Sequence, residues 1–243
     1  MAAVKKTELV EIKPLEMAEV NVRIVGDTPL IMHAWSAKAK RKILYKEVFG
    51  KNFGEEVRDP VGDFCSSMYW LDPMPEKFDE NTVFEAVKAA RFGFPVTAFK
   101  QAAISAAYRM GWTKDKMSTR GCFFIEPDAT SYYSGDLEVD LARKSINIIP
   151  NVPRAEQLVE IHSDTPLMRE DMVRVGMGSA DMRYRGEFQN WSCDLKIKYN
   201  TNGAYRLDQI LNMINAGGTV CGIGEWRPER DGQYGLYHVV LDM

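Results

Sequence analysis

The chain has 243 residues, of which 45% are hydrophobic and 27% are charged, as in an ordinary globular protein. Its 31 Lys and Arg residues against 34 Asp and Glu residues give a net charge of −3. This balance excludes a uniformly basic protein that binds nucleic acid indiscriminately, but it is compatible with a local basic groove. The sequence has neither an apolar run long enough to span a membrane nor a signal-peptide pattern, so we expect a cytoplasmic protein without a membrane partner.

The first predicted elements are a strand and a basic helix. Residues 18–33 alternate apolar Val20, Val22 and Ile24 with polar neighbours, which predicts a half-buried strand that ends at Gly26-Asp27. A helix is predicted over 36–48, with Ser36 as its N-cap. One face of this helix is basic and carries Lys38, Lys40, Arg41 and Lys42.

The segment from about 50 to 80 mixes Gly, Pro and Asp with aromatic residues, which favours an insertion with local structure over a core element. Its apolar residues need a partner surface; they are Phe64, Met68, Tyr69, Trp70 and Leu71. Two helices are then predicted, over 81–92 and 96–110. The second is rich in alanine and ends at Gly111, which indicates close packing against a sheet.

The remaining elements are mostly strands. Short strands are predicted at 122–125, 137–141, 146–149 and 158–162, two of which should form a protruding hairpin. Residues 181–199 alternate strongly and predict a second hairpin, and 206–216 predict a helix that stops at Gly217-Gly218. A last strand is expected over 234–241.

This order predicts an α+β fold with a ferredoxin-like, RRM-like βαββαβ core. We expect a single domain over 1–243, with insertions at about 50–80 and 122–165. The four cysteines, Cys65, Cys122, Cys193 and Cys221, form no C-x-x-C pair, which favours buried reduced thiols over a zinc site. We therefore expect neither a metal nor another cofactor.

Two segments resemble motifs of the RAMP superfamily, the RRM-like CRISPR-associated proteins. Phe94 to Tyr108 (FPVTAFKQAAISAAY) is similar to the family segment in which a turn leads into a helix that carries a lysine. Gly222 to Gly235 (GIGEWRPERDGQYG) is similar to the family's Gly-rich loop before the last strand. The chain departs from the first motif, since Pro95-Val96 replaces Pro-Gly and Gln101 replaces the glycine after the lysine.

Both segments carry candidate nucleic-acid contacts. In the first, Thr97 would cap the helix, and Lys100 would add a charge beside backbone N–H groups that suit a phosphate. In the second, Arg227 and Arg230 would bind phosphate and Trp226 would stack on a base. The alternatives are an ordinary cap with a solvent-exposed lysine, and a loop that only joins a helix to a strand.

Two further groups of cations are candidates. Arg183 and Arg185 lie two apart in a predicted strand and so point to one face, which on an open RRM-like sheet would contact bases or phosphates. The alternative is an exposed strand face paired with nearby acids. Lys38, Lys40 and Arg41 would contact nucleic acid from the basic helix; the alternative is that they only form its solvent-exposed face.

Catalysis finds little support in the sequence, and we expect no enzyme. The histidines His33, His162 and His238 show no metal-binding spacing, and only His33 resembles the placement of a catalytic histidine in nucleolytic RAMP relatives.

The resemblance implies a backbone-type subunit of a CRISPR effector-like complex that binds single-stranded RNA, or DNA, and packs against copies of itself and other subunits. One alternative is a virus-encoded RRM-like protein that acts by protein contact. The other is an RNA-processing endonuclease.

Overall fold

Two long antiparallel strands, β1 (Met17–Gly26) and β12 (Ser192–Asn200), pair along most of their length. This computed structural model describes residues 14–240 except 55, 78, 133–134 and 176–177. Alternate side chains of both strands are buried: Val22 and Ile24 lie opposite Leu195 and Cys193. The alternation seen in the sequence therefore gives one buried and one exposed face, as expected.

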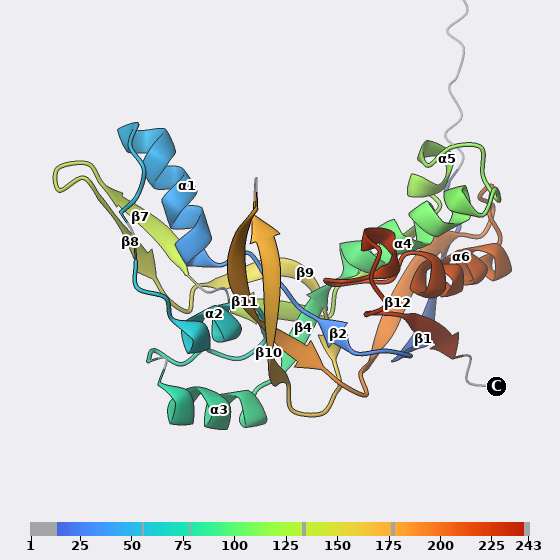
Figure 1. Ribbon diagram of the computed structural model, residues 1–243. Helices are drawn as coiled ribbons and strands as arrows, with labels where there is room; N and C mark the ends of the chain where they lie inside the picture. The colour runs from blue at the N-terminus through green and yellow to red at the C-terminus, as the bar shows by residue number, and fades with distance from the viewer. Residues whose placement is uncertain (1–13, 55, 78, 133–134, 176–177, 241–243) are drawn as a thin grey trace, which may run out of the picture.

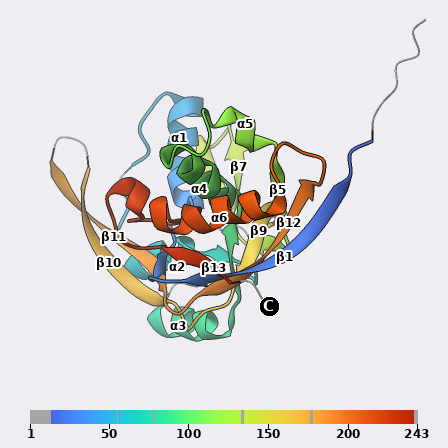
Figure 2. The ribbon, with the colours of Figure 1, turned by 90° about the vertical axis from the view of Figure 1, so that its right-hand side faces the viewer.

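This pair belongs to a four-stranded sheet with two helices, whose elements come in the order β1, α4, β5, β12, α6, β13 along the chain. The new elements are α4 (Val96–Arg109), β5 (Phe123–Glu126), α6 (Leu207–Val220) and β13 (Tyr237–Val240). The strands lie in the order β13-β1-β12-β5, and all neighbours are antiparallel. This is the ferredoxin-like arrangement, so the predicted α+β fold is confirmed (Figures 1 and 2).

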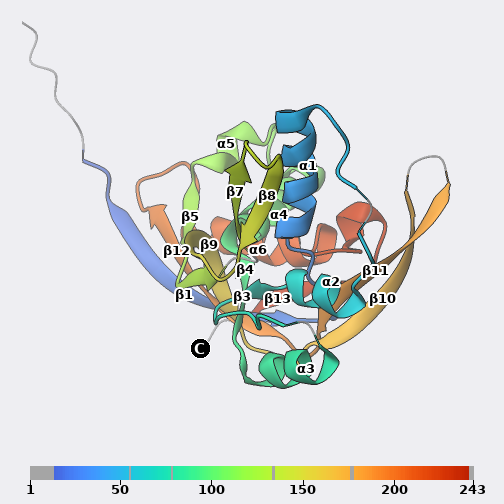
Figure 3. The same ribbon diagram turned by 90° about the vertical axis from the view of Figure 1, so that its left-hand side faces the viewer.

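Two long insertions interrupt this frame and pair with each other. Between β1 and α4 the chain forms β2 (Leu30–Ile31), α1 (Ala37–Phe49), α2 (Pro60–Ser66), β3 (Tyr69–Trp70), α3 (Glu80–Ala89) and β4 (Phe92–Pro95). Between β5 and β12 it forms β6 (Ala129–Tyr132), β7 (Asp136–Asp140), β8 (Ser145–Ile149), β9 (Pro153–Ile161), β10 (Leu167–Val175) and β11 (Ser179–Phe188). Strands of both insertions combine in two further sheets, β3-β4-β9-β6 and β10-β11-β2. The predicted protruding hairpin is confirmed as β7–β8, beside α1 (Figure 3).

The segment 50–80 is more than a local insertion, which corrects the prediction made for it. Phe64, Met68 and Trp70 are buried in the same apolar cluster as the residues of the β13-β1-β12-β5 sheet. The indole of Trp70 packs on Phe92 of β4 at 4.9 Å and donates a hydrogen bond to the backbone oxygen of Cys65. The partner surface that these residues needed includes β4, which Tyr69 and Trp70 contact through Phe94 and Phe92, and Phe84 of α3, which packs on Phe64.

The hairpin predicted over 181–199 is also wrong. Strand β11 pairs with β10 and with β2, whereas β12 pairs with β1 and β5 in a different sheet. Buried Phe188 and Trp191 flank the point where the chain crosses between the two sheets. Apolar and polar residues alternate in both β11 and β12, so the sequence pattern alone does not show that the two strands belong to different sheets. The predicted helix 81–92 likewise ends at Ala89, because Phe92 belongs to β4.

Gly217 and Gly218 do not end α6, which continues to Val220. They bring the helix close to its neighbours instead. A Cβ atom on Gly218 would collide with the carbonyl oxygen of Tyr237, and one on Gly217 would lie 2.8 Å from the backbone nitrogen of Ala103 in α4. The two glycines therefore set the spacing between α6, α4 and β13.

Replacing Gly218 by alanine should destabilise the protein by about 2 kcal/mol, because the methyl group has no room beside Tyr237. In an unobstructed helix the same change would be stabilising. Urea unfolding of the variant measures the difference. Gly121→Ala is the control, since no atom lies within 4 Å of its Cβ position; equal stability of both variants would contradict the close contact.

All four cysteines are free, and Cys65, Cys193 and Cys221 are buried. Burial raises the pKa of the Cys65 thiol to about 12 and that of Cys122 to about 11. The prediction of buried reduced thiols holds for three of the four, and Cys122 is half-buried. Among the described residues, no helix has the length and apolar character needed to cross a membrane.

Candidate nucleic-acid interface

A groove lined by six cationic side chains lies between α4, α5 (Met117–Arg120) and the loop before β13. The six are Lys100, Arg109, Lys116, Arg120, Arg227 and Arg230. Glu229 is the only acid among the described residues that line this basic groove, which encloses about 810 Å³. The groove thus concentrates positive charge on a chain whose net charge is −3.

Helix α4 supplies one wall of the basic groove. Thr97, Lys100, Gln101, Ser105 and Arg109 line it and recur at helical spacing. Thr97, Gln101, Ser105 and Arg109 follow one another at four-residue spacing along the helix, and Lys100 lies about one turn after Thr97. The opposite face is buried, with Phe99 and Ala103 in the core.

The cations of the groove differ in whether a carboxylate pairs with them. Glu229 pairs with Arg109 at 3.2 Å and with Arg227 at 3.1 Å. Arg120 and Arg230 are exposed and form no ion pair with any described residue. These two guanidinium groups are therefore available to an anionic ligand.

Lys100 lies within the groove, but Thr97 does not cap α4 as predicted. The N-cap is Pro95, and no side chain accepts a hydrogen bond at that end of the helix. The Lys100 ammonium lies over the ring of Phe124, 4.4 Å from its centroid. Burial lowers the pKa of Lys100 below its ordinary value.

The glycine-containing loop forms the opposite wall and is fixed by its own chain. Gly224 has φ +77°, and a Cβ atom there would collide with Leu30 and Ile31 of β2. The next residue, Glu225, donates a backbone hydrogen bond to Ile31 at 2.9 Å. Glycine at position 224 thus lets the loop pack closely against β2, and Arg227, three residues later, lines the groove.

Trp226 is 37% exposed but does not line the basic groove. It adopts φ +53°, which is unusual for a bulky residue. Its carbonyl oxygen accepts a hydrogen bond from the backbone of Tyr234 at 2.9 Å. Stacking of a base on Trp226 stays a prediction.

A second hollow, the hairpin pocket, lies between α1 and β11 and is lined by Lys38, Arg58, Arg183 and Arg185 among others. Arg183 and Arg185 share one face of β11, as predicted. Their strand is not part of the four-stranded sheet, however, so the open-sheet placement is wrong. Both pair with acids: Arg183 with Asp181 at 2.8 Å and Arg185 with Asp171 at 3.0 Å.

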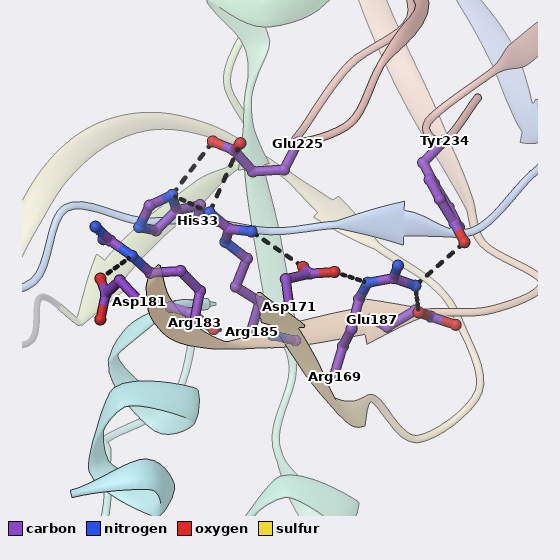
Figure 4. Close-up of polar contacts among 11 residues, drawn as sticks. His33, Arg169, Asp171, Asp181, Arg183, Arg185, Glu187, Glu225 and Tyr234 are labelled. Atoms are coloured by element: carbon purple, nitrogen blue, oxygen red, sulfur yellow. Dashed lines mark hydrogen bonds and ion pairs between the residues drawn. The ribbon is translucent and has the colours of Figure 1, made fainter. Parts of the chain in front are cut away.

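The β10–β11 hairpin is joined to the rest of the molecule by a charged network (Figure 4). Asp171 accepts hydrogen bonds from Arg185 and, at 2.8 Å, from Arg169. Arg169 also bonds to Glu187 at 2.7 Å and to the Tyr234 hydroxyl at 3.2 Å. Because Tyr234 belongs to the loop before β13, the network connects this hairpin to the wall of the basic groove.

A third hollow, the central pocket, lies between the other two. It shares Thr97, Gln101, Arg227 and Glu229 with the basic groove and His33 with the hairpin pocket. His33 Nδ1 lies 3.2 Å from Glu225 Oε1, and this contact lowers the pKa of the Glu225 carboxyl. The central pocket therefore adjoins both of the other hollows through shared lining residues.

The remaining predicted contacts in α1 lie apart from the basic groove. Lys38 lines the hairpin pocket. Lys40 lies over the ring of Trp35, 5.9 Å from its centroid. Arg41 pairs with Glu56 and stacks on Phe53, so part of the basic face stabilises the start of the first insertion.

The open face of the β13-β1-β12-β5 sheet carries acidic and basic side chains that form ion pairs with one another. Lys196 bonds to Glu126 at 2.7 Å and to Glu19 at 2.9 Å, and Arg23 pairs with Asp194 at 2.9 Å. These contacts already occupy the cations that a phosphate would need. The basic groove is therefore the stronger candidate interface.

Sequence reasoning missed Arg109, Lys116 and Arg120. Arg109 lies on the same row of α4 as Thr97, three steps of four residues further along the helix. Lys116 and Arg120 come from a short segment in which no pattern singles them out. Only the fold brings them next to Arg227 and Arg230.

No family model matches the sequence, and no curated protein matches it either. Among solved structures, the chain is similar to one described as "Cryo-EM structure of the Type III-B Cmr-beta bound to cognate target RNA". The TM-score is 0.39 at 11% sequence identity, and the match covers 93% of this chain. The chain spans 60% of the length of the chain it matches.

Proposed function

We propose that this chain is a backbone-type RAMP subunit that binds single-stranded RNA in the basic groove and assembles with copies of itself along the strand. One observation carries the proposal. The two segments that resemble RAMP motifs, 94–108 and 222–235, lie side by side and form opposite walls of a groove with six cations and one acid.

Binding would rest on phosphate contacts. Arg120 and Arg230 form no ion pair among the described residues, and Lys100, Arg109 and Arg227 lie along the same groove. A single strand suits this track because its bases are not paired and can enter the adjoining central pocket. The phosphate contacts give affinity without requiring a particular sequence.

Assembly is supported by exposed apolar side chains on two separate parts of the molecule. Val139 and Leu141 are exposed at the β7–β8 hairpin, and Tyr108, Met110 and Trp112 are exposed at the end of α4. Figure 1 shows these two elements on opposite sides of the molecule. Contacts between two different surfaces of the same chain propagate into a helical filament unless they close into a ring.

The proposal is tested by titrating a labelled single-stranded RNA with the protein at several salt concentrations, followed by electron microscopy of the mixture. We expect log Kd to vary linearly with log salt, with a slope of roughly 3 to 4 if about five phosphates are contacted. Filaments or short arrays should appear with RNA. A protein that shows no binding at low salt and stays monomeric would contradict the proposal.

A further inference from the structure

Strand β10 is an edge strand of the sheet β10-β11-β2, and its outer edge pairs with no strand of the described chain. Residues 168–174 make no backbone hydrogen bond to the described residues outside the β10–β11 ladder. Figures 2 and 3 show the β10–β11 hairpin projecting from the body of the molecule. An extended edge of this kind presents N–H and C=O groups with which a further strand can pair.

The two faces of β10 differ in what their side chains contact. Arg169 and Asp171 belong to the charged network and hold one face of the strand in place (Figure 4). Side chains alternate along a strand, so Glu170, Met172 and Arg174 lie on the other face. All three are exposed, and Met172 is 74% exposed. The strand is thus anchored by one set of side chains and presents the other set to solvent.

Glu170 and Arg174 carry opposite charges and lack a charged partner in the described chain. The residues opposite them on β11 are Tyr184 and Ala180. The two charged residues are four positions apart, which is about 13 Å along a strand, so they do not pair with each other. Neither forms an ion pair or a side-chain hydrogen bond with a described residue. Each is therefore available to an opposite charge on a second molecule.

The spacing of these side chains makes the edge complementary to itself. When two copies of β10 are aligned antiparallel with Met172 opposite Met172, Glu170 of each copy lies opposite Arg174 of the other. A shift of the register by two residues in either direction removes both charge pairs. Opposite charges directly across two antiparallel strands attract each other, and methionine adapts its shape to the surface that it meets. A two-fold axis at Met172 therefore satisfies both charge pairs at once.

We propose that β10 pairs with β10 of a second copy of this chain and forms a symmetric dimer with strand order β11-β10-β10-β11. The charge complementarity in this register selects a second copy as the partner. The contact uses neither the basic groove nor the exposed apolar side chains of α4 and the β7–β8 hairpin. It goes beyond the proposed function, because it requires neither RNA nor the contact between two different surfaces.

Sedimentation velocity at increasing protein concentration, without RNA, tests this dimer. We expect the wild-type protein to pass from monomer to dimer as its concentration rises. Glu170→Arg should raise the dimer dissociation constant by at least about tenfold, because the symmetry creates a like-charge pair at two positions. Arg174→Glu should have the same effect. Both positions are exposed, so the variants should keep the fold.

A mixture of the two single variants provides the sharpest arm of the test. In a dimer with one copy of each, both arginines of the Glu170→Arg chain lie opposite glutamates of the Arg174→Glu chain. The mixture should therefore dimerise about as well as wild type, although each variant alone does not. A mixture that stays as monomeric as its components would contradict the proposed register.

Glu47→Arg is the matched control, because Glu47 is exposed on α1 and the change in charge is the same as in Glu170→Arg. It should dimerise like wild type. A wild-type protein that stays monomeric, or single variants that dimerise as well as this control, would overturn the β10 contact. The single variants should bind single-stranded RNA like wild type. Loss of RNA binding by the wild-type protein would instead overturn the proposed function.

Discussion

Replacing Arg120 and Arg230 together by glutamate should weaken the binding of single-stranded RNA on the order of a hundredfold. Both guanidinium groups are exposed in the basic groove and lack an ion pair among the described residues, so their removal breaks no ion pair within that part of the chain. Glutamate would also repel the phosphates. Anisotropy titrations of wild type and variant measure the change, and the salt slope should fall by roughly 1.4 for the two lost contacts.

The control for this variant is Arg143→Glu with Arg206→Glu. Both side chains are exposed and lie outside the groove, in the β7–β8 turn and before α6. Each double variant shifts the net charge by the same amount, from −3. The control should bind RNA within about threefold of wild type if the two sites are independent. An equal loss in both variants would show that only total charge matters and that the groove is not the binding site.

Replacing Asp171 by alanine should destabilise the protein by about 3–5 kcal/mol, the cost of removing one partner from a buried ion pair. Asp171 is 7% exposed and is bonded to both Arg169 and Arg185, of which Arg185 is 5% exposed. Its loss leaves these two guanidinium groups near each other without the carboxylate between them. Urea unfolding monitored by tryptophan fluorescence gives the change in the free energy of unfolding.

Asp194→Ala provides the comparison, since Asp194 pairs with Arg23 across two strands on an exposed face. Such pairs contribute about 1 kcal/mol or less. If Asp171→Ala were as mild as this control, the network would not hold the β10–β11 hairpin to the loop before β13.

The ferredoxin-like frame could be predicted because its signals are local. Alternation in β1 and the apolar spacing of α6 each define an element within a few turns or residues. Which strands pair is set by contacts between distant residues. Strands β11 and β12 alternate alike, yet they belong to different sheets. The role of Gly217-Gly218 could not be predicted for the same reason. Glycine occurs both where a helix ends and where a helix packs closely on a neighbour, here Tyr237.

The candidate site was predictable to the extent that its residues lie in recognisable segments. The two motif-like segments point to Lys100, Arg227 and Arg230, which meet in one groove. Arg183 and Arg185 share a face of β11 with Asp181, the partner of Arg183, but the partner of Arg185 is Asp171, on a strand that the sequence does not relate to it. Arg120 belongs to the groove only because the turn after α4 returns it to that helix.

The central claim is that single-stranded RNA lies in the basic groove, and photo-crosslinking tests it most directly. RNA carrying 4-thiouridine would be crosslinked to the protein, and the modified peptides identified by mass spectrometry. We expect crosslinks within 94–120 and 222–235, the segments that form the groove. Crosslinks confined to β1, β5 and β12, on the open face of the four-stranded sheet, would contradict this account.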